Sequence, residues 1–203
     1  DIVGCGRTDA GVHASQFYFH VDLPEKYEGS QLMYKLNNML PCQIAVLNIY
    51  KVASDAHARF DAEHRTYRYF IHRRKDPFLT NLSWYFPQQL DIKRMNIAAE
   101  QLIGKKDFTS FSKLHTDVKT NICDLSSAKW VETSDHECYF EVTANRFLRN
   151  MVRAIVGTMI EVGLGNLSSS DVEKIIKAQD RGEAGMSVPA KGLFLYRVEY
   201  PYL

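Results

Sequence analysis

Several features that would place the protein in a large class are missing from the sequence. No C-x-x-C pair occurs, and the seven histidines show no H-E-x-x-H spacing, so no metal site is indicated. No apolar run approaches the length that spans a bilayer, and no signal peptide is present. The four cysteines are widely scattered, which predicts reduced thiols in a cytoplasmic protein: Cys5, Cys42, Cys123 and Cys138. We therefore expect a protein with neither a metal nor a membrane association.

Charge of one sign is also lacking. The formal net charge is +1, whereas dedicated nucleic-acid binders are often much more basic. Binding to nucleic acid would therefore require the positive charge to gather on one face. Low-complexity segments are absent as well. The 203 residues, 45% of them hydrophobic, are enough for a full core in one large or two small domains.

One short stretch, Gly6 to Ala14, concentrates residue types that do chemistry. It reads Gly-Arg-Thr-Asp-Ala-Gly-Val-His-Ala and shows neither a helical nor a strand period. Its two glycines allow a sharp backbone turn, which predicts a tight loop that presents Asp9. Arg7 lies close enough in sequence to orient that carboxylate and keep it ionised. The composition also fits an ordinary turn, in which an Asp side chain bonds its own backbone.

Hydrophobic periodicity predicts an α+β fold with a mainly antiparallel sheet. Residues 53–62 follow no period, and we interpret them as a hinge between two units, 1–56 and 57–203. In the first unit, Phe17 and Phe19 mark the apolar face of a half-buried strand. Helices are expected over 30–40, 91–103, 146–162 and a short segment after Ser168; strands are expected over 16–22, 44–52, 64–73, 124–132, 137–144 and 193–198.

The expected strand over 64–73 interleaves basic and aromatic residues. Its alternation places Arg65 and Tyr67 on one face, with Arg68 beside them in the sequence. Guanidinium groups next to aromatic rings suit a splayed RNA base and its phosphates. The pattern also fits the solvated outer face of a sheet.

A second basic group lies in the expected helix over 146–162. Arg146, Arg149 and Arg153 are spaced three and then four residues apart, which places them within roughly 60° around a helix. Like charges that close repel each other unless an anion lies among them. The group therefore predicts a phosphate-binding edge, although a solvent-facing charged edge has the same pattern.

The stretch from Gly6 to Ala14 resembles the signature of the tRNA pseudouridine synthase A family. Other segments are similar to family segments in the expected order: Tyr67-Arg68-Tyr69, Phe108-Thr109-Ser110-Phe111, Met151-Val152-Arg153-Ala154-Ile155-Val156-Gly157, Gly192-Leu193-Phe194-Leu195 and Tyr200-Pro201. Ala154 stands where the family usually has Asn. Family members begin with an extra strand and helix before the signature. Because this sequence lacks both that segment and an initiator Met, we expect it to be part of a longer chain.

The resemblance implies a pseudouridine synthase fold, with two similar α+β halves flanking a cleft. Residues 1–56 would be the remainder of the first half, and 57–203 would be the second half. The implied reaction is the isomerisation of uridines at tRNA positions 38, 39 and 40, in the anticodon stem-loop, to pseudouridine. The family is implied to work without a cofactor and as a homodimer.

The resemblance also assigns roles to residues. Asp9 is implied to be the catalytic carboxylate, Tyr67 the ring that packs on the uracil, and Arg153 the cation paired with Asp9. Arg7 is expected to contact RNA or orient the loop. Further RNA contacts are expected from Arg65, Arg68, Arg146 and Arg149.

Two other functions stay open at this point. A non-catalytic RNA-binding module would use the same basic residues without turnover. An Asp-dependent hydrolase is disfavoured, because no second carboxylate and no nucleophile–base pair stands out.

Overall fold

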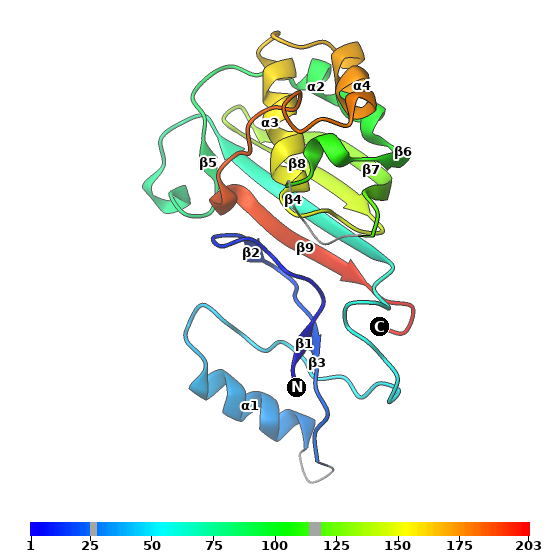
Figure 1. The fold of residues 1–203 in the computed structure, drawn as a ribbon. Helices are drawn as coiled ribbons and strands as arrows, with labels where there is room; N and C mark the ends of the chain where they lie inside the picture. The colour runs from blue at the N-terminus through cyan, green and yellow to red at the C-terminus, as the bar shows by residue number, and fades with distance from the viewer. Residues whose placement is uncertain (25–27, 114–118) are drawn as a thin grey trace.

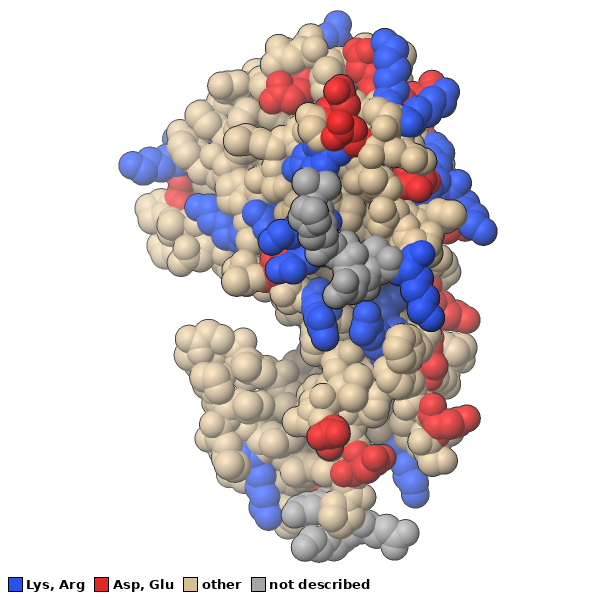
Figure 2. All heavy atoms as spheres, in the orientation of Figure 1, with Lys and Arg blue, Asp and Glu red and all other residues tan. Residues whose placement is uncertain are grey.

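The computed structural model describes residues 1–24, 28–113 and 119–203. A large mixed sheet with helices on one side forms the main body, and a smaller N-terminal part lies below it (Figure 1). The surface is hollowed between these two parts (Figure 2).

The large sheet contains seven of the strands in the described chain. They are β2 (His13–Ala14), β4 (His64–His72), β5 (Trp84–Tyr85), β6 (Gly104–Asp107), β7 (Ile122–Ser134), β8 (Glu137–Ala144) and β9 (Leu193–Glu199). The spatial order is β2-β9-β4-β8-β7-β6, with β5 joined to β4. The pairs β2–β9 and β4–β5 are parallel and the others are antiparallel. The expected α+β fold with a mainly antiparallel sheet is confirmed.

Side-chain alternation explains which face of the sheet is covered. Along β8, Phe140 and Val142 are buried, whereas Tyr139 and Glu141, which alternate with them, are partly exposed. The register opposes Trp130 of β7 to Phe140, so large apolar groups from neighbouring strands meet on one face. That face is covered by helices, and the other face is polar and aromatic.

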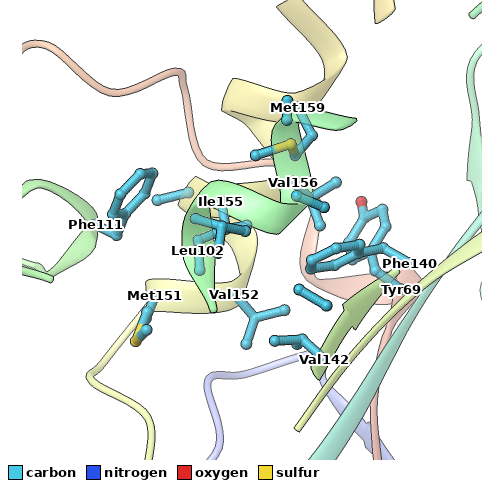
Figure 3. Packing of buried hydrophobic residues seen from close by; sticks show 14 of the residues in the cluster. Tyr69, Leu102, Phe111, Phe140, Val142, Met151, Val152, Ile155, Val156 and Met159 are labelled. Carbon is cyan, nitrogen blue, oxygen red and sulfur yellow. The ribbon is translucent and has the colours of Figure 1, made fainter. Parts of the chain in front are cut away.

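Three α-helices gather on the buried face of the sheet: α2 (Ile92–Ala99), α3 (Met151–Gly163) and α4 (Ser169–Ala178) (Figure 1). Helix α3 is buried on nearly every side, and only Arg153 and Glu161 within it are partly exposed. Its side chains lie beside Phe140 and Val142 of β8 (Figure 3). Short 3-10 helices are η1 (Pro77–Leu79), η2 (Glu100–Leu102), η3 (Thr109–Phe111) and η4 (Ala190–Gly192). Within the described ranges, no helix has the length and apolar character needed to cross a membrane.

The N-terminal part is held differently. Strand β1 (Val3–Gly4) pairs antiparallel with β3 (Phe19–His20), and α1 (Gly29–Met39) contains no buried residue. A small apolar cluster joins this part to the end of β9: Cys5, Ala62, Leu195, Val198 and Tyr200. Because β2 lies before residue 56 yet belongs to the large sheet, the division into 1–56 and 57–203 stays a prediction.

The expected strand over 44–52 is wrong, because this segment forms no regular structure. The side chain of Asn37 in α1 makes two hydrogen bonds to the backbone of Val46, through its Oδ1 at 2.7 Å and its Nδ2 at 2.9 Å. These bonds satisfy the peptide groups that a partner strand would otherwise pair.

The expected strand over 16–22 is confirmed only at Phe19–His20. The assignment of its buried face was wrong, because Phe17 and Phe19 are 46% and 47% exposed while Tyr18 packs on the small apolar cluster. Tyr18 is the buried residue because its ring packs edge-on against Tyr200, directly after β9, with ring centroids 5.2 Å apart.

The long helix begins at Met151 rather than at Arg146. Asn150, directly before it, takes a left-handed conformation with φ of 68°, which an α-helix cannot continue through. Arg146 and Arg149 therefore lie before the helix, and the expected helical grouping of three arginines is wrong.

Candidate active site

The loop that carries Asp9 is fixed at both ends. Before it, the backbone N–H of Cys5 donates to the carbonyl oxygen of Tyr18 at 2.8 Å. After it, His13 and Ala14 of β2 pair with β9. The N–H of Val12 donates to the carbonyl of Asp9 at 3.1 Å, closing a tight turn. Gly11 takes a φ of 80° in this turn, which accounts for a glycine at that position.

Two arginines reach the Asp9 carboxylate. Arg153 Nη1 lies 3.1 Å from Asp9 Oδ2, and Arg149 Nε lies 3.7 Å from Asp9 Oδ1. The side chains of Asp9 and Arg153 are only 24% and 20% exposed, whereas that of Arg149 is 61% exposed. The ion pair between Asp9 and Arg153 is therefore stronger than the one between Asp9 and Arg149. Arg153 of α3 is the residue that the sequence predicted as the partner of Asp9.

A neighbouring loop orients the Arg153 guanidinium. Arg153 Nε donates to the carbonyl oxygen of Val188 at 2.7 Å. The loop can lie this close because position 157 is glycine, where a Cβ atom would come within 1.8 Å of the Met186 carbonyl oxygen. Gly185 N–H donates to Thr158 Oγ1 at 2.9 Å and fastens the loop to α3. Sequence reasoning missed Val188, because nothing in a spacing of 35 residues indicates a backbone contact.

Tyr67 of β4 packs against the segment that leads into α3. Its ring packs edge-on against Phe147, with ring centroids 5.0 Å apart. The pKa of Tyr67 is raised to about 12, mainly by burial; Cys5 and Asp9 contribute to the rise, and Arg65 opposes it. The influence of Asp9 means that the two side chains lie within electrostatic reach. The tyrosine hydroxyl therefore stays neutral over the whole physiological range.

Arg65 and Arg68 have protein partners, which differs from the RNA contacts expected for them. Arg65 donates to four backbone carbonyl groups. Arg68 points to the opposite face of β4, where its Nη2 lies 2.7 Å from Glu141. There its guanidinium carbon lies 3.6 Å from the ring centroid of Tyr196 and 4.7 Å from that of Tyr139. Most of the hydrogen bonds of both guanidinium groups are made within the protein, and the RNA contacts expected of these two arginines stay predictions.

The other predicted basic residues lie in the Asp9 loop and in the segment before α3. Arg7, in the same loop, and Arg149 are exposed, and Arg146 is partly exposed in the segment before α3. Lys and Arg side chains gather beside the hollow between the two parts of the molecule (Figure 2). The low overall charge is thus compatible with a locally positive face, as the composition required.

Groups for metal binding do not gather in the described parts of the chain. No cluster of three or more His, Cys, Asp or Glu side chains occurs there. His13 instead shares a hydrogen bond of 2.8 Å with the carbonyl oxygen of Asn81 and stacks on Phe194, with centroids 4.6 Å apart. It therefore fastens the Asp9 loop to its surroundings.

Comparison with known proteins gives a consistent result along the chain. Residues 98–201 match the family model described as tRNA pseudouridine synthase. The chain is 51% identical to tRNA pseudouridine synthase A of Bacteroides fragilis, over 99% of this chain and 80% of that protein. It is also 51% identical to tRNA pseudouridine synthase A of Porphyromonas gingivalis, over 98% and 81%. The protein of the same name from Bacillus subtilis is 39% identical, over 98% and 81%.

Proposed function

Because the chain belongs to the tRNA pseudouridine synthase A family, we propose that it isomerises uridine to pseudouridine in tRNA. The observation that carries the proposal is a single partly buried carboxylate, Asp9, held by Arg153 at 3.1 Å. The reaction breaks the N1–C1′ bond, turns the uracil and joins C5 to C1′. The C5 hydrogen leaves as a proton and N1 takes one up, so the atoms balance. Neither an oxidant nor an energy source is needed.

The site supplies what this reaction requires from protein groups. Asp9 acts on the ribose, either as a base or as a nucleophile. Arg153 fixes the direction of the Asp9 carboxylate through a charge-assisted hydrogen bond. The target base must leave its stack, and the neutral ring of Tyr67 then packs on the extruded uracil.

Binding of the rest of the tRNA is assigned to exposed cations around Asp9. Arg7, Arg146 and Arg149 are the proposed phosphate contacts, since they lie in the catalytic loop and in the segment before α3. We expect the anticodon stem-loop to be the target and two copies of the chain to act together, as the family resemblance first implied.

Release of tritium from tRNA labelled at uridine C5 tests the proposal. The protein is expected to release label, and Asp9→Asn, which keeps the size of the side chain, is expected to release none. Asp135→Asn, in the exposed turn between β7 and β8, is the matched control and should release label normally. A protein that shifts tRNA mobility without releasing label would be an RNA-binding module, and the enzymatic proposal would be wrong.

A further inference from the structure

Arg65 of β4 holds four backbone carbonyl groups from three separate segments of the chain. Its Nη2 donates to Cys5 at 3.0 Å and to Arg59 at 2.7 Å. Its Nη1 donates to Ala62 at 3.2 Å and to Asn145 at 3.1 Å. Cys5 lies between β1 and the Asp9 loop. Arg59 and Ala62 lie in the connection over 53–62, and Asn145 lies in the turn after β8. Among the described residues, no other side chain forms hydrogen bonds to as many backbone groups.

Two of these carbonyl groups lead directly into the active site. Cys5 lies four residues before Asp9, and Asn145 lies four residues before Arg149. A chain of four residues spans at most about 14 Å, so Arg65 fixes the origin of both segments within a short reach of the carboxylate. The far end of the Asp9 loop has its own fixed point, the pairing of β2 with β9.

We propose that Arg65 is a positioning residue that sets the distance between Asp9 and its two arginines. The inference rests on the proposed function. Without this guanidinium, the loop keeps its fixed point at β2 but loses the one that joins Cys5 to the segment before α3. Asp9 and Arg153 are 144 residues apart in sequence, so their separation depends on such connections between the two parts.

The chemistry of the guanidinium explains why arginine stands here. It is planar and always charged, and its two Nη atoms carry four N–H groups that fit four carbonyl oxygens. A lysine ammonium has three donors at one point and cannot reach oxygens on several sides. The same difference separates this role from a phosphate contact, at which lysine is an adequate substitute.

Kinetics of Arg65→Lys and Arg65→Ala on tRNA give the first test. Both variants should lower kcat by roughly 100-fold, the effect of about 1 Å of misplacement at a reacting group. The dissociation constant for tRNA and its salt dependence should stay unchanged, because Arg65 does not neutralise a phosphate. Methylguanidinium should restore part of the turnover of Arg65→Ala, compared with sodium chloride at equal ionic strength. Arg94→Ala, which removes an exposed arginine of α2 that pairs with Asp91, is the control with normal kcat.

Thiol labelling gives a test that does not depend on catalysis. In a Cys42→Ser background the remaining thiols are all buried, with Cys5 and Cys123 both fully inaccessible. Arg65→Lys should raise the labelling rate of Cys5 by roughly tenfold, the effect of losing a hydrogen bond to a charged group. Labelling of Cys123 and Cys138 should not change.

The outcomes separate the two proposals. Normal kcat with a weaker salt dependence would make Arg65 an RNA contact and overturn its positioning role. Equal acceleration at all three cysteines would make it a general element of stability and would also overturn that role. The unaltered protein could release no tritium while Cys5 alone becomes more reactive in Arg65→Lys. That result would overturn the proposed reaction but support the role of Arg65 in positioning the segment at Cys5.

Discussion

The two parts of the molecule are packed in very different ways. In α3 all but two residues are buried, whereas α1 has no buried residue. The N-terminal part also exposes much apolar surface, for example Tyr34 at 71% and Met39 at 82%. Yet Asp9 belongs to the loosely packed part and its main cation to the tightly packed one.

This difference raises the question of how Asp9 is held in place, because the N-terminal part that carries it buries few apolar side chains. The Asp9 loop takes its position from a few specific connections to the large sheet rather than from packing within its own part. These connections are β2 pairing, the small cluster around Cys5 and the guanidinium of Arg65. Substitutions on the two sides should therefore fail in different ways.

The largest effect is expected from removing the buried partner of Asp9. Arg153→Met keeps most of the side-chain stem but leaves the partly buried carboxylate without its closest cation. Because Asp9 then loses the hydrogen bond that fixes its direction, kcat should fall by roughly 100-fold. Arg149→Met, which removes the exposed arginine at 3.7 Å, is the control and should have a clearly smaller effect on kcat. Equal losses of kcat in single-turnover assays would contradict the distinction between them.

Shortening an apolar side chain should lower the free energy of unfolding more in the tightly packed part than in the N-terminal part. Ile155→Ala, at a fully buried position of α3, should lower the free energy of unfolding by about 2–5 kcal/mol. Leu36→Ala, on α1, should lower it by less than about 1 kcal/mol, because the site is partly exposed and leaves no closed cavity. Urea denaturation followed by circular dichroism measures both. A similar loss in the two variants would mean that α1 is packed as firmly as α3.

Arg149 should affect tRNA binding more than catalysis. Arg149→Ala removes one exposed cation, so the slope of log affinity against log salt should fall by about one phosphate contact. Filter binding over a series of potassium chloride concentrations measures this slope. An unchanged slope would remove Arg149 from the RNA-binding face.

The smallest effect is expected on the outer face of the sheet. Burial raises the pKa of Glu141, but hydrogen bonds from Arg68 and Lys129 outweigh it, so the net pKa is lowered from 4.5. A lowered carboxylate pKa gives stability that is present above the ordinary value and is lost as the pH falls through the folded value. Arg68→Ala should therefore lower the free energy of unfolding by up to about 1 kcal/mol at pH 7 and by almost nothing near pH 3. Thermal unfolding at both pH values measures the difference, and an equal cost at both would exclude the ion pair as its cause.

Local sequence patterns predicted the elements that alternate or repeat strongly. The strand over 64–73, the hairpin of β7 and β8, and the helices α2, α3 and α4 were all confirmed, with changed boundaries. The failures occurred where a nearby side chain competed with the pattern. Asn37 bonds the backbone of Val46, and the left-handed Asn150 delays the start of α3. Strand β6, which reads Gly-Lys-Lys-Asp, gave no apolar signal and was missed.

The sequence by itself determined the family, the position of the Asp9 loop and the residue types in it, because a motif of nine residues is a local property. Only the tertiary structure decided which arginine does what. Arg65 holds backbone carbonyl groups, Arg68 pairs with Glu141 on the other face, and Arg153 reaches Asp9. All three are arginines in basic segments, so composition cannot distinguish them. Their partners come from distant parts of the chain, and the direction of each side chain relative to those partners exists only once the sheet and α3 have packed.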